Sequence, residues 1–243
     1  MCGRFMLIQD ANSLRERFRA ELPVETSLQP SYNISPGKRT PVITGLQPHE
    51  IQMFHFGLIP FHAVKPVPLT EARSEGENNP TNDPGFAGEM GIFTTPAFRK
   101  PILAQRCLVP ADAYIVGTTD EKIQRPYLIY LRNKIRPFAL AGIWDVWINP
   151  DSDESICSFA IVTTYSNRLI ARLPYSRMPV ILQREDESKW LSGGASPEEL
   201  AALMRPYPAE WMNGFPIAPT IRNPLANDPG LIHPVGPRIF TER

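Results

Sequence analysis

The chain has 243 residues, of which 42% are hydrophobic and 21% charged, the composition of a globular protein that can bury a substantial core. Its 25 basic and 25 acidic residues give no net charge, which excludes a globally basic nucleic-acid binder. No apolar run approaches the roughly 18–20 residues of a membrane span, and no signal segment opens the chain, so we expect a cytoplasmic protein without a membrane partner.

The cysteine and histidine positions argue against a metal site. Cys2, Cys107 and Cys157 form no Cys-x-x-Cys pair and are odd in number, which is atypical of a zinc site or a disulfide framework. No pair of histidines has metal-ligand spacing, and no Gly-rich phosphate loop follows a strand. We therefore predict neither a metal nor a cofactor, and we expect a monomer.

The predicted elements are short, in keeping with 27 prolines, about twice the usual share. Asn12 or Ser13 is expected to cap a first helix that ends before Pro23. Strands are expected at residues 41–46, 51–59, 107–116, 127–131, 138–147, 158–164 and 180–182. A helical turn that ends before Pro101 is expected at 95–100, and short helices at 167–173, 185–191 and 197–204, the last capped by Ser196. This order predicts a single α+β domain over residues 1–243, with a curved, partly barrel-like mixed or antiparallel sheet flanked by short helices.

Residues 76–91 have turn-forming composition throughout. We predict that they form a flexible loop inserted into the domain. A lid over a site is the alternative interpretation.

Acidic residues are absent from three windows, at residues 26–49, 90–111 and 155–184. The basic residues of these windows are Lys38, Arg39, Arg99, Lys100, Arg106, Arg168, Arg172, Arg177 and Arg184. If the windows fold onto one face, they form the positive stripe that a nucleic-acid backbone needs. Chance segregation on a surface of mixed charge is the alternative.

The opening residues Met1-Cys2-Gly3-Arg4-Phe5 offer unusual chemistry if Met1 is removed. Cys2 then carries an α-amine and a thiol on adjacent carbons, with reference pKa values of about 7.7–8.0 and about 8.5. Together they can trap an aldehyde, because the amine forms a Schiff base and the thiolate closes a thiazolidine ring. The alternative is an ordinary small residue at position two.

Five further motifs follow Cys-Gly-Arg-Phe in order along the chain. They are Tyr-Asn-Ile-Ser-Pro-Gly at 32–37, Phe-Gly-Leu-Ile-Pro at 56–60, Ala-Arg-Ser-Glu at 72–75, Arg-Cys-Leu-Val-Pro-Ala-Asp at 106–112 and Arg-Met-Pro-Val-Ile-Leu at 177–182. From Cys2 to about Pro237 the chain resembles the SRAP family, the SOS-response-associated peptidases or abasic-site processing proteins. The resemblance implies a DNA-associated protein that binds single-stranded DNA, removes its own initiator methionine and links Cys2 covalently to the aldehyde of an abasic site.

The resemblance also implies three partners for the cysteine, and this chain departs at all three. Glu71 stands where the family has an Asn, Val116 where it has a Glu, and Tyr175 where it has a His. Gly117 replaces the Trp that follows the Glu. We hypothesise that Glu71 has taken over acid/base catalysis and that Tyr175 still donates a hydrogen bond. The alternative is that Glu71 is a spectator in a decayed site.

The DNA-binding positions of the family are better preserved. The resemblance implies that Arg4, Arg73 and Arg177 hold phosphates, while Asn33 helps to fix the N-terminal loop near the DNA. Phe61 follows a motif whose loop carries DNA-wedging aromatic residues in the family, so it is expected to stack on a base. A buried hydrophobic role is the alternative for Phe61.

Three functions remain open from the sequence. The leading interpretation is a protein that captures abasic-site aldehydes in single-stranded DNA as a thiazolidine on Cys2. The second is a diverged, non-catalytic paralogue that keeps the fold and binds single strands. The third is an unrelated N-terminal-cysteine amidohydrolase, which would need an oxyanion hole that the sequence does not reveal.

Overall fold

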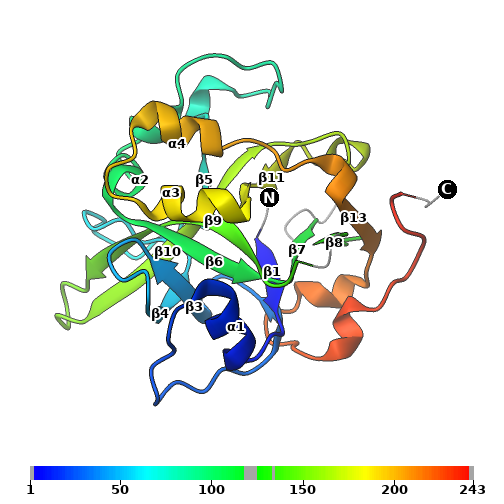
Figure 1. Cartoon of the computed structure of the whole chain (residues 1–243), viewed down its shortest axis with the longest axis horizontal. Coiled ribbons are helices and arrows are strands. Elements are labelled where there is room, and N and C mark those ends of the chain that lie inside the picture. Colours follow the sequence, from blue (N-terminus) through cyan, green and yellow to red (C-terminus); the bar gives the residue numbers. More distant parts are fainter. Residues whose placement is uncertain (1–2, 118–124, 133–134, 241–243) are drawn as a thin grey trace.

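The computed structural model describes residues 3–117, 125–132 and 135–240, and Figure 1 shows a β-rich body with short helices around it. The strands are β1 (Arg4–Leu7), β2 (Ser31–Ile34), β3 (Arg39–Thr44), β4 (Ile51–Phe56), β5 (Glu71–Arg73), β6 (Arg106–Ala111), β7 (Ala113–Val116), β8 (Tyr127–Leu131), β9 (Phe138–Ile148), β10 (Ser155–Tyr165), β11 (Arg177–Pro179), β12 (Ile181–Leu182) and β13 (Met212–Pro216). The α-helices are α1 (Ala11–Phe18), α2 (Pro101–Ala104), α3 (Glu187–Leu191) and α4 (Pro197–Leu203). The 3₁₀ turns are η1 (Gly76–Asn78), η2 (Gly91–Phe93), η3 (Ile170–Arg172), η4 (Arg184–Asp186), η5 (Ala209–Trp211), η6 (Pro219–Arg222) and η7 (Pro229–Ile232).

Five strands of the larger sheet close on themselves. β10 pairs with β4 and β9, β9 with β6, β6 with β3, and β3 with β4. Closure removes the exposed backbone edges of these strands and encloses their inward side chains, among them Phe56 and Phe159, whose rings stack with centroids 5.3 Å apart. The predicted α+β class with a partly barrel-like sheet is confirmed.

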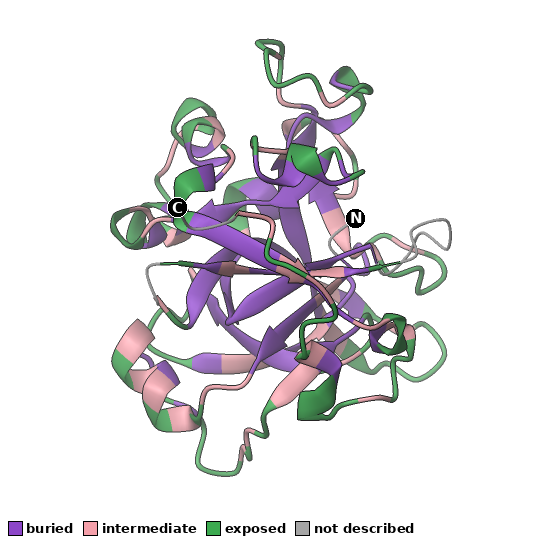
Figure 2. Ribbon diagram, turned by 90° about the vertical axis from the view of Figure 1, so that its right-hand side faces the viewer, coloured by how far each residue is buried: buried purple, intermediate pink, exposed green. Residues whose placement is uncertain are grey.

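The smaller sheet has the order β13-β8-β7-β1-β2, so the first strand of the chain lies inside it, between β7 and the edge strand β2. Phe5 of β1 is fully buried and meets the edge of Phe56 at 5.4 Å, which joins the two sheets through one aromatic contact. Burial of each such ring contributes roughly 1.5–3 kcal/mol, so β1 is anchored by its own side chains. Figure 2 shows the buried strands at the centre, with exposed residues in the peripheral turns and helices.

The strand expected at 107–116 is divided at Asp112, where the chain passes from the larger sheet to the smaller one. The buried carboxylate of Asp112 accepts hydrogen bonds from the backbone of Ile8 at 2.7 Å and the side chain of Gln9 at 3.1 Å. Burial raises the pKa of this carboxyl, and these hydrogen bonds oppose the shift. The Ala-Asp pair of the motif thus holds the end of β1 beside β7.

Local signals predicted helix starts with mixed success. The capping of α4 by Ser196 is confirmed, with Glu199 completing a capping box. The cap expected for α1 at Asn12 or Ser13 is wrong, because Asp10 accepts the hydrogen bond from the backbone of Ser13. The turn expected at 95–100 is present, since the backbone N–H groups of Phe98 and Arg99 donate to the Thr95 carbonyl oxygen at 2.9 and 2.8 Å. Its expected end before Pro101 is wrong, because α2 begins there and proline lacks only an N–H that a first helical residue does not need.

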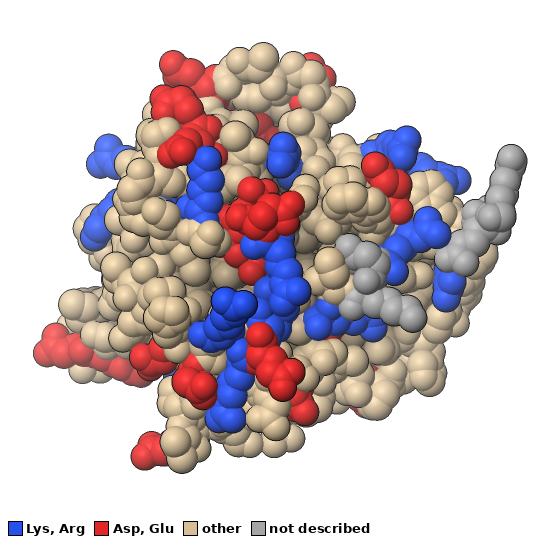
Figure 3. All heavy atoms as spheres, viewed as in Figure 1, with Lys and Arg blue, Asp and Glu red and all other residues tan. Residues whose placement is uncertain are grey.

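The acid-free windows do not place all of their basic residues on the surface. Arg106 is 2% exposed, and its guanidinium donates to the carbonyl oxygens of Ile102 and Trp190 at 2.6 Å each and to that of Ser192. Arg177 is likewise buried. On the face seen in Figure 3 basic side chains gather in a band through the centre, with acidic side chains at its upper end and beside it.

Candidate functional site

Cys2 lies outside the described residues, but the strand that follows it fixes the surroundings of the chain's start. Gly3 is buried, and Arg4 pairs with Ile115 of β7 in antiparallel register. The end of β7 therefore lies beside the beginning of β1. Val116, at that end, is fully buried in the hydrophobic core and offers no proton donor there.

Tyr175 lies against the residue that follows β7. A Cβ atom built on Gly117 would lie 2.0 Å from the hydroxyl oxygen of Tyr175 and 2.9 Å from its Cζ. Gly117 also has a φ of +84°, a conformation that side chains of L-residues rarely adopt. The tyrosine, 9% exposed, thus fills the space over Gly117 next to the start of β1.

Glu71 and Arg73 share one face of β5, on either side of the buried Ala72. Pairing of β5 with β10 sets them opposite Ile161 and Thr163. The Oε2 atom of Glu71 and the Nε atom of Arg73 are buried and have no hydrogen-bond partner among the residues described. Such unsatisfied polar atoms are costly, which makes this face a candidate for ligand contact.

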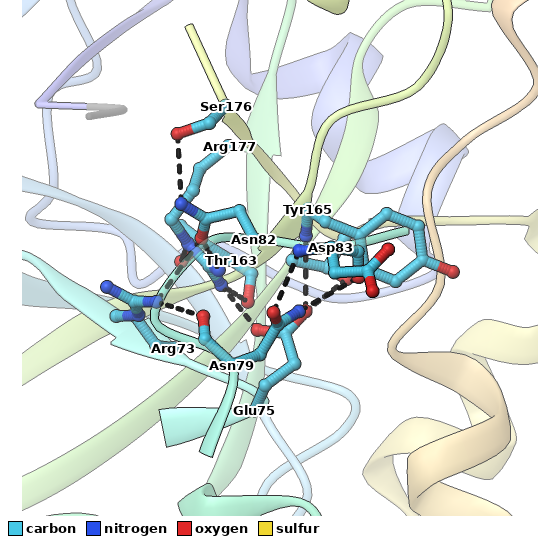
Figure 4. Close-up of polar contacts among 10 residues, drawn as sticks. Arg73, Glu75, Asn79, Asn82, Asp83, Thr163, Tyr165, Ser176 and Arg177 are labelled. Atoms are coloured by element: carbon cyan, nitrogen blue, oxygen red, sulfur yellow. Dashed lines mark hydrogen bonds and ion pairs between the residues drawn. The ribbon is translucent and has the colours of Figure 1, made fainter. Parts of the chain in front are cut away.

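Arg177, the best enclosed of the three arginines expected to hold phosphates, is bound on several sides by protein atoms (Figure 4). Its Nη2 lies 2.8 Å from the Glu75 carboxylate and 2.7 Å from the Thr163 carbonyl oxygen, while Nε donates to the Thr163 hydroxyl at 3.2 Å. Its Nη1 donates to Oδ1 of Asn82 at 2.7 Å. The guanidinium is therefore part of the interior of the site.

Glu75 is the buried anion of this network, with a fully enclosed side chain. Its Oε1 accepts hydrogen bonds from the Thr164 hydroxyl at 3.1 Å and the Tyr165 backbone at 3.2 Å. Burial by itself raises the pKa of the Glu75 carboxyl, but the Arg177 charge and the hydrogen bonds outweigh it and hold the pKa below its usual range. Glu75 is therefore ionised at neutral pH and fixes Arg177 in place.

The 76–91 segment reaches the site through Asn82. Oδ1 of Asn82 accepts from Arg177 at 2.7 Å and from Nη2 of Arg73 at 3.2 Å, while Nδ2 donates to the Ser176 hydroxyl at 3.0 Å (Figure 4). Nη2 of Arg73 also donates to the Asn79 carbonyl oxygen at 2.9 Å. The segment thus links two arginines that lie more than one hundred residues apart; its predicted flexibility remains a prediction.

Arg4 and Asn33 meet in a second polar cluster. Nη1 of Arg4 donates to Oδ1 of Asn33 at 3.0 Å, and Lys38 donates to the Asn33 carbonyl oxygen at 2.8 Å. Burial, and next the charge of Arg4, lowers the pKa of the Lys38 ammonium, so the two cations lie close together. The acceptors in these bonds are neutral oxygens, which leaves the positive charge of the pair available to an anion.

The amide nitrogen of Asn33 is itself occupied. It lies 3.1 Å from the carbonyl oxygen of Ile221 and 2.9 Å from those of Asn223 and Ala226. Arg4 adds a bond of 2.7 Å to the carbonyl oxygen of Arg222. Asn33 therefore ties residues 221–226 to β2. This contact positions Arg4 and Lys38, and the Asn33 amide is not offered to a ligand.

Phe61 is 51% exposed and lies five residues after the end of β4. Its backbone N–H donates to the Asp145 carboxylate at 2.8 Å, and the Lys100 ammonium lies 4.5 Å from the centre of its ring. A half-exposed ring beside a cation is suited to stacking on a base near a phosphate.

Sequence reasoning missed four residues of these clusters: Glu75, Asn82, Lys38 and Lys100. Glu75 ends the Ala-Arg-Ser-Glu motif, and the two lysines lie in acid-free windows, so signals existed for them. For Asn82 the sequence gave no signal beyond the turn-forming composition around it. Its φ of +56° is a conformation that asparagine adopts more readily than most residues.

Other features of the described chain lie apart from this site. A cavity of about 860 Å³ between α1, β3 and α3 includes Phe18, Ile43 and Leu191 and contains no predicted site residue. The described residues include no group of three or more His, Cys, Asp or Glu side chains able to hold a metal ion. None of the helices in that part of the chain has the length and apolar character needed to cross a membrane.

Comparison with known proteins gives one consistent relationship. The model of the family described as SOS response associated peptidase (SRAP) matches residues 1–224. Abasic site processing protein YoqW of Bacillus subtilis is 31% identical over 240 residues, which cover 96% of this chain and 99% of that protein. Abasic site processing protein HMCES of Xenopus tropicalis is 26% identical over 83% of this chain and 65% of its own length. A crystal structure of a protein from Bacteroides thetaiotaomicron has a TM-score of 0.81 at 29% identity, covering 96% of this chain and all of that one.

Proposed function

The chain belongs to the SRAP family, and from that premise we propose that it processes abasic sites in single-stranded DNA by covalent capture on Cys2. The relatives named for abasic site processing support the substrate, since one of them aligns with nearly all of this chain.

The proposed reaction needs Met1 to be removed, because an acylated nitrogen cannot form a Schiff base. The freed α-amine of Cys2 adds to the aldehyde carbon of the opened sugar to give a carbinolamine. Loss of one water leaves an imine, and the Cys2 sulfur then adds to the imine carbon while its proton moves to nitrogen. The product is a thiazolidine, formed from amine, thiol and aldehyde with release of a single water molecule, so no oxidant or metal takes part.

One observation supports this proposal above the others: β1, which begins two residues after Cys2, lies inside the smaller sheet beside candidate DNA contacts. β1 lies between β2 and β7, and β7 is followed by Gly117, which Tyr175 contacts. Arg4 of β1 and Lys38, four residues after β2, are bonded to neutral oxygens. A nucleophile at this start would therefore act next to a pair of cations suited to a phosphate.

Proton transfer is assigned to Glu71 and hydrogen bonding to Tyr175. Collapse of a carbinolamine needs an acid to carry off water, and the buried, unpartnered Oε2 of Glu71 is an oxygen with spare capacity in the described site. The Tyr175 hydroxyl, adjacent to Gly117, replaces the hydrogen-bonding function of the family's histidine.

A specific observation favours the second candidate, a paralogue that binds single strands without capture. Val116 is fully enclosed in the core at the position of the family's glutamate, so no side chain there can move a proton. The two candidates share Arg4, Phe61 and Arg73 and differ only in covalent chemistry.

The deciding experiment mixes the purified protein with a single-stranded oligonucleotide that carries one abasic site. A denaturation-resistant adduct is expected, and Cys2→Ala should abolish it. The matched control is Cys157→Ala, which removes a half-buried thiol in β10 and should leave adduct formation unchanged. Intact mass reports whether Met1 is absent. Binding without an adduct, in protein that has lost Met1, selects the non-catalytic candidate.

A further inference from the structure

Arg73 is held along one edge by two neutral oxygens of the 76–91 segment. Its Nη2 donates to the Asn79 carbonyl oxygen at 2.9 Å and to Oδ1 of Asn82 at 3.2 Å. Two acceptors on the same nitrogen fix the orientation of the guanidinium, which otherwise has many rotamers. No dashed line reaches the other nitrogens of Arg73 in Figure 4, and its buried Nε has no hydrogen-bond partner among the described residues.

Asn82 is itself fixed, so it can act as a support. Its backbone has a φ of +56°, which asparagine tolerates better than most residues. Its side chain is bound on both ends, to Arg177 at 2.7 Å and to the Ser176 hydroxyl at 3.0 Å. The turn that carries it is closed by Asn79, whose Oδ1 accepts from the Asp83 backbone at 2.8 Å.

The two arginines of this cluster differ in the charges beside them. The Glu75 carboxylate lies 2.8 Å from Arg177 and compensates its positive charge. Among the described residues no carboxylate lies within ion-pair distance of Arg73. An amide at position 82 therefore supplies hydrogen bonds to Arg73 without cancelling its charge.

We propose that Asn82 is a positioning residue that aims Arg73 at a phosphodiester of the bound single strand while keeping the arginine's charge uncompensated. The inference rests on the proposed function, since it names a backbone phosphate of the single strand as the ligand of Arg73. A purely structural role would require the bonds of Asn82 but would be indifferent to charge at this position.

The test compares Asn82→Asp with Asn82→Ala, using an undamaged, fluorescently labelled oligothymidine at several salt concentrations. Asn82→Asp keeps the acceptor oxygen but compensates the charge of Arg73, so the affinity should fall at least tenfold. The slope of log affinity against log salt concentration should become shallower by about 0.7, the contribution of one phosphate contact on a single strand. Asn82→Ala keeps the charge and frees the side chain, so the affinity should fall about threefold to tenfold with a similar slope.

Two comparisons make the result specific. Arg73→Ala should reproduce the slope of Asn82→Asp, and the double variant should be no weaker than Arg73→Ala alone. Asn78→Asp places the same charge in the same segment on an exposed residue whose amide bonds to Glu89, and it should bind like the parent. Thermal unfolding of each variant shows whether the fold is retained; if Asn82→Asp does not fold, Asn82→Ala decides.

Parent-like affinity of either folded Asn82 variant, or additive effects of Asn82→Asp and Arg73→Ala, would overturn the inference. Failure of the parent protein to bind oligothymidine would also overturn the inference. That result would leave the proposed adduct formation on Cys2 unaffected. Conversely, normal binding and a clear Asn82 effect without any adduct would overturn the capture reaction and leave this inference in place.

Discussion

The hydroxyl oxygen of Tyr175 occupies the place where a side chain on Gly117 would begin, 2.0 Å from an ideal Cβ atom. The two residues replace a His and a Trp that the family resemblance leads one to expect. Because their side-chain spaces overlap, the larger residue at 175 requires the absence of one at 117. The departures from the family pattern are thus sterically linked, and each constrains the other.

Gly117→Ala should therefore destabilise the protein by more than the roughly 1–2 kcal/mol that a left-handed backbone alone costs an L-residue. Urea unfolding measures this change. In a Tyr175→Ala background the added penalty should shrink, because the two Tyr175 atoms nearest the new Cβ are gone and only Pro126 Cα, at 3.3 Å, stays close. Gly193→Ala is the control, since nothing lies within 4 Å of a Cβ there. A Gly117→Ala variant as stable as the parent would contradict the overlap.

Glu75→Gln should cost about 3–5 kcal/mol of unfolding free energy near pH 7, because it leaves the buried Arg177 without its counter-ion. The folded-state pKa of Glu75 is lowered, so its contribution is present above the ordinary carboxyl pKa and is lost as pH falls through the folded value. The parent should therefore lose stability in acid, and the variant should lose less.

The control for Glu75 is an exposed ion pair. Glu210 lies 3.2 Å from Arg168, and both side chains are more than half exposed. Glu210→Gln should change stability by no more than about 1 kcal/mol. Denaturant titration at pH 7 measures both variants. Equal effects of Glu75→Gln and Glu210→Gln would show that the Glu75 network adds little to the free energy of unfolding.

Glu71→Gln should slow adduct formation by about 100-fold or more, the usual contribution of a general acid or base. Binding of undamaged single strands should stay unchanged. Glu77→Gln removes an exposed carboxyl six residues away and serves as the control. An unchanged cross-linking rate would reject the transfer of catalysis to Glu71.

Phe61→Ala should weaken binding of single strands by about 1–3 kcal/mol, the usual contribution of one stacked base. The backbone bond from Phe61 to Asp145 is kept, so the loop should hold its conformation. Val64→Ala, in the same loop and 85% exposed, should have little effect. Fluorescence anisotropy measures both affinities, and equal losses would assign the contribution to the loop in general.

Local patterns predicted much of the fold. The strand expected at 127–131 begins and ends at those residues, and the Ser196 cap follows from a four-residue motif. The burial of Arg177 could not be predicted locally, because its partner Glu75 lies 102 residues away in the sequence. The division at Asp112 was missed for the same reason, since its hydrogen-bond donors come from Ile8 and Gln9, which directly follow β1.

The grouping of the candidate site residues could not be predicted from the sequence. Motif positions singled out Arg4, Asn33 and Arg73 as candidates, but not the backbone carbonyl oxygens to which the structure ties Asn33. Asn82 lies in a turn whose composition predicts irregular backbone, and composition carries no information about which arginine its amide reaches.

The position of β1 between two other strands has a practical consequence for anyone who expresses this protein. An affinity tag fused ahead of Met1 would be attached close to the start of β1, which pairs with β2 and β7. It would also keep the nitrogen of Cys2 as an amide. Material purified through such a tag would score as inert in cross-linking assays, so recombinant work should use a carboxyl-terminal handle.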